Sequence, residues 1–165
     1  MEQVRMAVIG AGYWGPHLIR NVSELPEAQM DMVVDLSLER LRVLQVRYPG
    51  VHMTQQFSEA LGDNIDAVVL ATPVKTHYAL ARRALQAGKH VLIEKPLTQR
   101  SCQALELVHL ADRQGVVLMV GHTFEYNPAV VSLREIVQRG DIGDVLYDWL
   151  PDLQLDEVER MSLCA

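Results

Sequence analysis

The sequence predicts an α/β fold, in which a doubly wound, mainly parallel sheet carries helices on both faces. Two observations predict it. Short runs of aliphatic and β-branched residues alternate along the chain with segments of helical periodicity. Most of the strand-like runs are continuously apolar, which is typical of strands that are buried on both faces of a parallel sheet.

Six apolar runs predict the strands. In chain order they are Val4–Gly10, Met30–Asp35, Val51–Met53, Ile65–Ala71, His90–Glu94 and Gly115–Val120. Helices are predicted where apolar residues recur every third or fourth position. These segments are Gly15–Glu24, Ser37–Tyr48, Thr76–Ala87, Ser101–Arg113 and a last one from about Pro128 to Arg139.

The same periodicity predicts which side chains each helix buries. The expected buried sets are Trp14, Leu18 and Val22; Leu41, Leu44 and Tyr48; Ala104, Val108 and Ala111; and Ala129, Leu133 and Ile136. For the third helix, Thr76 is the expected N-cap and Gly88 the expected residue just past the end.

The composition excludes several classes of protein. The 165 residues suffice for one domain, and the net charge of −6 argues against nucleic acid or an anionic membrane as a partner. Cys102 and Cys164 have no metal-like or redox spacing, and no two histidines have ligand spacing. This spacing predicts a metal-free protein. The N-terminus does not resemble a leader and no apolar run is long enough to span a membrane, so a cytoplasmic protein is expected.

The first predicted strand leads directly into "GAGYWG", in which Gly10, Gly12 and Gly15 match G-x-G-x-x-G. Gly10 permits a tight turn, Gly12 lets the backbone approach a pyrophosphate, and Gly15 lets the helix pack closely on its strand. The free N–H groups at the helix start would bind the diphosphate. A strand before this motif and a helix after it predict a Rossmann dinucleotide site.

Asp35 ends the second predicted strand, 20 residues after Gly15. A carboxylate there accepts hydrogen bonds from the adenosine ribose hydroxyls and repels a 2′-phosphate. The next residues are "LSL", so no arginine follows directly, and the sequence favours NAD over NADP. Two alternatives stay open for Asp35: a polar strand end, or an N-cap of the next helix.

Methyltransferases share a glycine-rich turn and an acid on the second strand, but the segments after Ile65 favour a different family. These segments are "ATPVKTH", "AGKHVLIEKPL" and "VGHTFEYNP". Together with "GAGYWG" and Asp35, they resemble the Gfo/Idh/MocA family, the glucose–fructose oxidoreductase and inositol dehydrogenase group, over residues 4–146. Within it, "GYWGP" followed by "RN", and "GHTFEYNP", look most like dehydrogenases that oxidise the 3-position of UDP-N-acetylglucosaminuronate.

The resemblance implies NAD as cofactor and a set of site residues. The residues implied to bind the cofactor are Gly10, Gly12, Tyr13, Trp14, Gly15, Asp35, Ala71, Thr72, Pro73, His77, Glu94 and Lys95. Lys95 is also implied to be catalytic and to touch the substrate. Further substrate contacts are implied for His122, Tyr126 and Asn127. The Lys95–Pro96 bond is implied to be cis, which only an X–Pro bond adopts at low cost.

Purely structural roles remain open for several of these residues. The alternatives are Thr72 and Pro73 as a loop start, His77 as a solvated helix residue, Trp14 and His122 as core residues, and Tyr126 and Asn127 as helix-capping residues. Lys95 differs, because an ammonium group at the end of a buried strand is costly without a partner or a task.

The resemblance predicts an NAD-binding domain over residues 1–146 and implies a second α/β domain after it. That second domain supplies the family's catalytic Asp and His, and the His accepts the proton of the sugar hydroxyl. Residues 147–165, "YDWLPDLQLDEVERMSLCA", are instead acidic and do not match the family. Two explanations are open: a truncated or frame-shifted chain, or a stand-alone module with its own tail.

The resulting hypothesis is an NAD-dependent dehydrogenase acting on a secondary alcohol of a sugar or nucleotide sugar, in which this chain is the cofactor-binding half. The alternative is an NAD-binding module without catalysis. Exposed apolar segments expected at Val120–Tyr126 and Val145–Trp149 predict that the chain forms a homo-oligomer.

Overall fold

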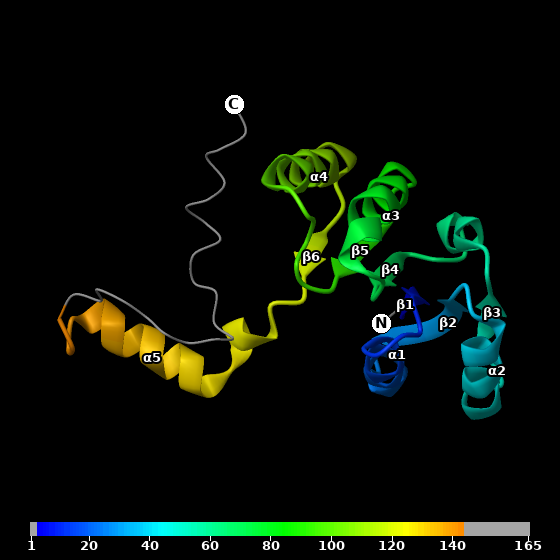
Figure 1. Ribbon diagram of the computed structural model, residues 1–165, viewed down its shortest axis with the longest axis horizontal. Helices are drawn as coiled ribbons and strands as arrows, with labels where there is room; N and C mark the ends of the chain where they lie inside the picture. The colour runs from blue at the N-terminus through cyan, green and yellow to red at the C-terminus, as the bar shows by residue number, and fades with distance from the viewer. Residues whose placement is uncertain (1–2, 144–165) are drawn as a thin grey trace. The chain divides into compact units, whose positions relative to one another are not determined.

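The computed structural model describes residues 3–143, which divide after Gly121 into two compact units. The larger unit contains one sheet of parallel strands with helices between them (Figure 1). The smaller unit contains the 3-10 helix η2 (Thr123–Tyr126) and the α-helix α5 (Pro128–Arg139).

Within residues 3–143, six strands form the sheet in the order β3-β2-β1-β4-β5-β6. They are β1 (Val4–Ile9), β2 (Ala28–Val34), β3 (His52–Thr54), β4 (Ala67–Leu70), β5 (His90–Ile93) and β6 (Leu118–Val120). The order reverses between β1 and β4, the signature of a doubly wound sheet, so the predicted fold class is confirmed.

Helices cover both faces of this sheet. They are α1 (Gly15–Glu24), α2 (Leu38–Arg47), α3 (Val74–Gln86) and α4 (Ser101–Gln114), with the 3-10 helix η1 (Phe57–Leu61) before β4. Successive residues of β1 point to opposite faces: Val8 packs with α1 and α2, whereas Ala7 and Ile9 pack with α3 and α4. The strands are therefore buried on both sides, as their continuous apolar runs predicted.

The predicted buried face is right for α2 and wrong for parts of α1 and α4. Leu41 and Leu44 are buried in α2. Trp14 is 53% exposed because it is the N-cap of α1 and lies outside its helical repeat, and the helix buries Gly15, Ile19 and Val22. In α4 the large leucines decide the buried face. Leu107 and Leu110 are buried with Ala111, whereas Val108 is exposed.

Several predicted boundaries also change, among them the starts of α3 and β2. Helix α3 begins at Val74 with Pro73 as N-cap, so Thr76 lies inside the first turn and is not the cap. β2 begins two residues earlier than predicted, since Ala28 and Gln29 pair with the first residues of β1. The predicted C-terminal role of Gly88 is confirmed by its left-handed φ of +72°.

In the smaller unit, no residue of α5 is buried among the described residues, so the predicted buried face of this helix is not observed. Phe124 and Tyr126 are exposed, as expected for the segment around them. The segment Val145–Trp149 and the acidic tail lie outside the described residues. Among residues 3–143, no helix is both long and apolar enough to cross a membrane.

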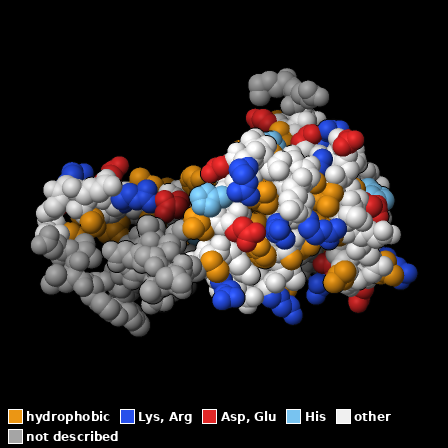
Figure 2. All heavy atoms as spheres, turned by 90° about the horizontal axis from the view of Figure 1, so that it is seen from above, with side chains coloured by type: hydrophobic (Ala, Val, Ile, Leu, Met, Phe, Trp, Pro, Cys, Tyr) orange, Lys and Arg blue, Asp and Glu red, His pale blue; other side chains and the backbone are white. Residues whose placement is uncertain are grey.

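The surface carries charges of both signs. On the face of the larger unit seen in Figure 2, basic, acidic and hydrophobic side chains are interspersed, without one extended basic field. Binding to a nucleic-acid backbone selects such fields, so this face gives no support for a nucleic-acid partner.

A charged pair joins the starts of β1 and β4. The Nη2 of Arg5 donates to Asp66 Oδ1 at 2.6 Å, and its Nε and backbone N–H donate to Oδ2 at 3.0 and 2.8 Å. In return, Asp66 N–H donates to the Arg5 carbonyl at 2.8 Å. These hydrogen bonds from Arg5 lower the pKa of Asp66 from 3.8 to about 2.

Asp66→Asn is expected to lower the free energy of unfolding by about 1 kcal/mol at pH 7, because the pair is only partly shielded from water. The folded pKa of Asp66 lies below its ordinary value. The contribution is therefore complete above about pH 4 and is lost as the pH falls toward 2. Urea unfolding at pH 7 and near pH 2 measures both effects. Asp112→Asn on α4 is the control, and an equal loss there would contradict the assignment.

Candidate functional site

Four loops meet at the carboxyl edge of the sheet, where the strand order reverses. Gly10 follows β1, Asp35 follows β2, Ala71 follows β4 and Glu94 follows β5. Ligands of open α/β sheets bind in the crevice at this point, because the loops on its two sides run in opposite directions.

The loop after β1 has the geometry that its glycines predict. Gly10 has a φ of +98°, and a Cβ there would lie 2.7 Å from the Ala71 carbonyl oxygen. A Cβ on Gly15 would overlap the carbonyl oxygen of Gly10, so only glycine lets α1 start this close to the loop. Gly10 N–H donates to the Val34 carbonyl at 2.7 Å, which ties the turn to β2.

Gly12 has a different environment. The nearest atom to a Cβ built at Gly12 is Nη1 of Arg40, at 4.0 Å. The absence of a side chain is therefore not required by packing within the described residues. It leaves room beside the backbone, which is where the sequence places the pyrophosphate.

Asp35 is 8% exposed and holds the glycine loop from the end of β2. Its Oδ2 accepts a hydrogen bond from Ala11 N–H at 2.6 Å, and its Oδ1 accepts one from Ser37 N–H at 2.7 Å. Ser37 is the N-cap of α2, so the alternative that Asp35 caps this helix is wrong. Each carboxylate oxygen has a second lone pair and so retains acceptor capacity.

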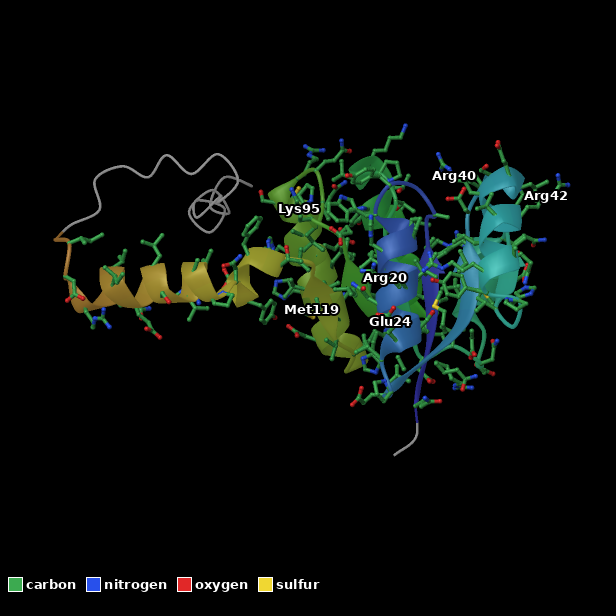
Figure 3. The ribbon with its side chains drawn as sticks, turned by 90° about the horizontal axis from the view of Figure 1, so that it is seen from below. Arg20, Glu24, Arg40, Arg42, Lys95 and Met119 are labelled. Carbon is green, nitrogen blue, oxygen red and sulfur yellow. The ribbon has the colours of Figure 1, made fainter. Side chains whose placement is uncertain are left out.

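Arg40 is a candidate site residue that the sequence patterns did not single out. Its Nη1 lies 3.7 Å from Oδ2 of Asp35, although five positions separate the two residues in the sequence. In Figure 3, Arg40 extends from the side of α2 nearer α1, whereas Arg42 extends from the opposite side. The sequence contained a sign of this contact. With Ser37 as N-cap, residue 40 falls in the first turn of the helix and therefore lies close to the end of the preceding strand.

The loop after β4 packs directly on the glycine loop. Ala71 N–H donates to the Ile9 carbonyl at 2.8 Å, and the Cγ2 of Thr72 lies 3.0 Å from the Cβ position of Gly10. Oγ1 of Thr76 lies 2.8 Å from Oγ1 of Thr72 and 2.7 Å from the carbonyl oxygen of Pro73. The first turn of α3 therefore holds this loop through the hydroxyl group of Thr76.

His77 is 1% exposed and lies between two loops, so the alternative of a solvated helix residue is wrong. Its Nε2 lies 2.7 Å from the Thr72 carbonyl oxygen, and its Nδ1 lies 2.9 Å from the Pro96 carbonyl oxygen. The ring thus joins the loop after β4 to the loop after β5.

The loop after β5 presents two charged groups in succession. Glu94 N–H donates to the Leu70 carbonyl at 2.9 Å, and the Glu94 side chain is half-buried beside Gly121. Lys95 is exposed at the same edge of the sheet (Figure 3). The Lys95–Pro96 bond is cis, as the resemblance implied.

Two aromatic residues extend from the glycine loop. Tyr13 is 82% exposed, and its ring meets that of Trp14 edge-on at 5.4 Å between centroids. His17 in the first turn of α1 completes the group, at 5.8 Å from Trp14. These rings form a wall at the start of α1 and are not part of the core.

The three remaining predicted residues belong to the smaller unit. His122 and Tyr126 are exposed, so His122 is not a core histidine. The side chain of Asn127 accepts a hydrogen bond from Ala129 N–H at 2.9 Å, which confirms its alternative role as the N-cap of α5. Their roles as substrate contacts stay predictions.

The doubly wound sheet, the glycine loop and the acid after β2 define a dinucleotide-binding domain of the Rossmann type. Comparison with known proteins identifies the family of this domain. A family model described as "Oxidoreductase family, NAD-binding Rossmann fold" matches residues 4–122, and the chain belongs to this family, Gfo/Idh/MocA. The resemblance found in the motifs is confirmed.

Several characterised proteins are similar to the chain. UDP-N-acetylglucosamine 3-dehydrogenase of Acidithiobacillus ferrooxidans is 34% identical over 140 residues, 82% of this chain and 42% of that protein. GenD2 from gentamicin A biosynthesis, solved in complex with NAD, is 33% identical with a TM-score of 0.80. KijD10, a 3-ketoreductase from Actinomadura kijaniata solved with NADP and TDP-benzene, is 28% identical with a TM-score of 0.77.

The chain spans less than half the length of these proteins. The two structural matches cover 86% and 84% of this chain, but only 40% and 43% of the solved chains. The shared part is the dinucleotide-binding domain. Since one neighbour was solved with NAD and the other with NADP, the comparison supports a nicotinamide dinucleotide without choosing between the two.

Gly15→Ala and Gly12→Ala are expected to differ in stability. At Gly15 the new methyl group meets backbone, which cannot give way, so the free energy of unfolding should fall by about 1–3 kcal/mol or more. At Gly12 there is room, and the loss should be below about 1 kcal/mol. Urea unfolding compares the two, with Gly50→Ala, which meets nothing within 4 Å, as the control. Equal losses would contradict the packing role of Gly15.

Proposed function

We propose that this chain is the NAD-binding part of a dehydrogenase that acts on a secondary alcohol of a sugar or nucleotide sugar. The observation that carries the proposal is the convergence of three groups at one edge of the sheet. They are the open backbone at Gly12, the oriented carboxylate of Asp35 and the exposed ammonium group of Lys95.

The residues present fit a dinucleotide. The space beside Gly12 admits a diphosphate next to the first N–H groups of α1. The backbone N–H groups of Ala11 and Ser37 hold the Asp35 carboxylate in place, with one lone pair on each oxygen left for the ribose hydroxyls. The loop from Ala71 to Pro73 would run beside the remainder of the cofactor.

Asp35 supports NAD over NADP, because its carboxylate repels a 2′-phosphate. Arg40 weakens this discrimination. Its guanidinium group lies 3.7 Å from Asp35 and is 57% exposed, so it can turn toward an added phosphate. We therefore propose a preference for NAD that is smaller than Asp35 alone would give.

Lys95 is the residue we propose for catalysis. When bound, the nicotinamide supplies the position that accepts or gives the hydride. The ammonium group of Lys95 would donate a hydrogen bond to the reacting oxygen of the substrate and stabilise the negative charge that develops there. The group that accepts the hydroxyl proton is not assigned to this chain.

The substrate class is proposed from the relatives. One is named a UDP-N-acetylglucosamine 3-dehydrogenase, and another is a 3-ketoreductase solved with a TDP ligand. The alternative that the sequence left open is an NAD-binding module without catalysis. Binding of NAD without nucleotide-sugar-dependent reduction would select this alternative.

The cofactor preference is testable by calorimetric titration of the chain with NAD and with NADP. NAD should bind more tightly, and Arg40→Ala should weaken NADP by about tenfold while changing NAD little, because only NADP offers a second partner for the guanidinium group. Arg42→Ala removes the same charge from the opposite side of α2 and is the control. Equal binding of both dinucleotides by the parent chain would contradict the role of Asp35.

In a full-length relative, replacement of the lysine that matches Lys95 by alanine is expected to lower turnover by about 100-fold or more and to leave NAD affinity nearly unchanged, because the ammonium group acts on the substrate oxygen. The assay follows formation of the reduced nicotinamide with UDP-N-acetylglucosamine as substrate, and a parallel titration follows NAD binding. Replacement by alanine of the residue that matches Lys75, on the exposed surface of α3, is the control. Unchanged turnover after the lysine replacement would remove Lys95 from the mechanism.

A further inference from the structure

The side chain of His77 contacts two loops of the site. The imidazole is 1% exposed, with one ring nitrogen on the Thr72 carbonyl and the other on the Pro96 carbonyl. Thr72 belongs to the loop that packs on Gly10, and Pro96 directly follows Lys95. The ring therefore links the glycine loop side of the site to the lysine side.

The loops at Thr72 and at Pro96 differ in the other contacts that hold them. On the Thr72 side, Thr76 lies within hydrogen-bond distance of both Thr72 and Pro73, and Ala71 bonds to Ile9. On the Pro96 side, Leu97 packs against the core, while Lys95 itself is exposed. The contact from His77 is thus a polar anchor for the carbonyl group of Pro96, the residue that follows Lys95.

The number of protons on the ring decides which carbonyl is bonded. Both partners are carbonyl oxygens, which only accept, and a neutral imidazole has one N–H. A neutral ring can therefore hold Thr72 or Pro96 but not both, whereas a ring with two N–H groups holds both. A hydrogen bond to Pro96, which would hold the segment that carries Lys95, requires the proton on Nδ1, the nitrogen 2.9 Å from the Pro96 oxygen.

We infer that His77 is a positioning residue, whose Nδ1–H holds the Pro96 carbonyl and so orients Lys95 relative to the loop around Thr72. The importance of that orientation rests on the proposed function of Lys95. The anchoring itself is a property of the chain without cofactor or substrate. It can therefore fail or hold independently of NAD binding.

Two substitutions separate the two ring nitrogens. His77→Asn places an amide N–H at the same bond separation from Cα as Nδ1, and His77→Gln places one at the separation of Nε2. We expect His77→Asn to retain the bond to Pro96 and His77→Gln to lose it. A purely structural requirement for the buried ring would damage both variants alike, so the difference between them is specific to positioning.

The measurement is the backbone 15N order parameter of Lys95, Leu97 and Thr98 in the chain without ligands. Values near about 0.85 are expected in the parent and in His77→Asn, and values below about 0.6 in His77→Gln. The exposed His109 on α4 provides the matched control, His109→Gln, which should change nothing. Low values in the parent, or equal values in the two His77 variants, would overturn the inference.

Long-range 1H–15N spectra of the parent give a second test that needs no variant and so does not depend on how the variants fold. A proton on Nδ1 of His77 supports the anchoring of Pro96. A ring with its only proton on Nε2 would leave Pro96 without the bond and would overturn the inference. If NAD fails to bind while both tests succeed, the proposed function fails and the role of His77 in ordering the turn stands.

Discussion

The pairing of β1 with β2 on one side and β4 on the other is the constraint on which the rest of the structure depends. Val8 is in register with Val33 in β2 and with Val69 in β4. Because all three strands are parallel, their carboxyl ends lie together, and Gly10 is held between Asp35 and Ala71. The crossovers to α1 and α3 then cover opposite faces of the sheet.

The site is held by hydrogen bonds within the chain. Asp35 bonds the glycine loop through Ala11, and His77 contacts the carbonyls of Thr72 and Pro96. Among the described residues, no buried side-chain nitrogen or oxygen lacks a hydrogen-bond partner. Such a network lowers the ordering cost of binding, because the backbone groups that would meet the cofactor are already in place.

Sequence periodicity was reliable for strands and weaker for helix faces. A continuously apolar strand in the centre of a sheet is buried whichever face a residue takes, so register does not affect the prediction. A helix buries the residues of one face only, and a small error in its predicted start changes which residues are assigned to that face. Trp14 was assigned to the core because it fits the repeat of Leu18 and Val22, yet it lies one position before α1 begins.

The sequence by itself determined the fold class, the glycine loop, the acid after β2 and the Gfo/Idh/MocA family, since these depend on local patterns and on their order along the chain. Only the tertiary structure decided the placement of Arg40 beside Asp35 and of His77 between two loops. The contact of His77 with Pro96 joins residues 19 positions apart, and a separation of that length does not determine a distance. Arg40 and His77 reach these positions because α2 and α3 begin at the carboxyl edge of the sheet, shortly after the ends of β2 and β4.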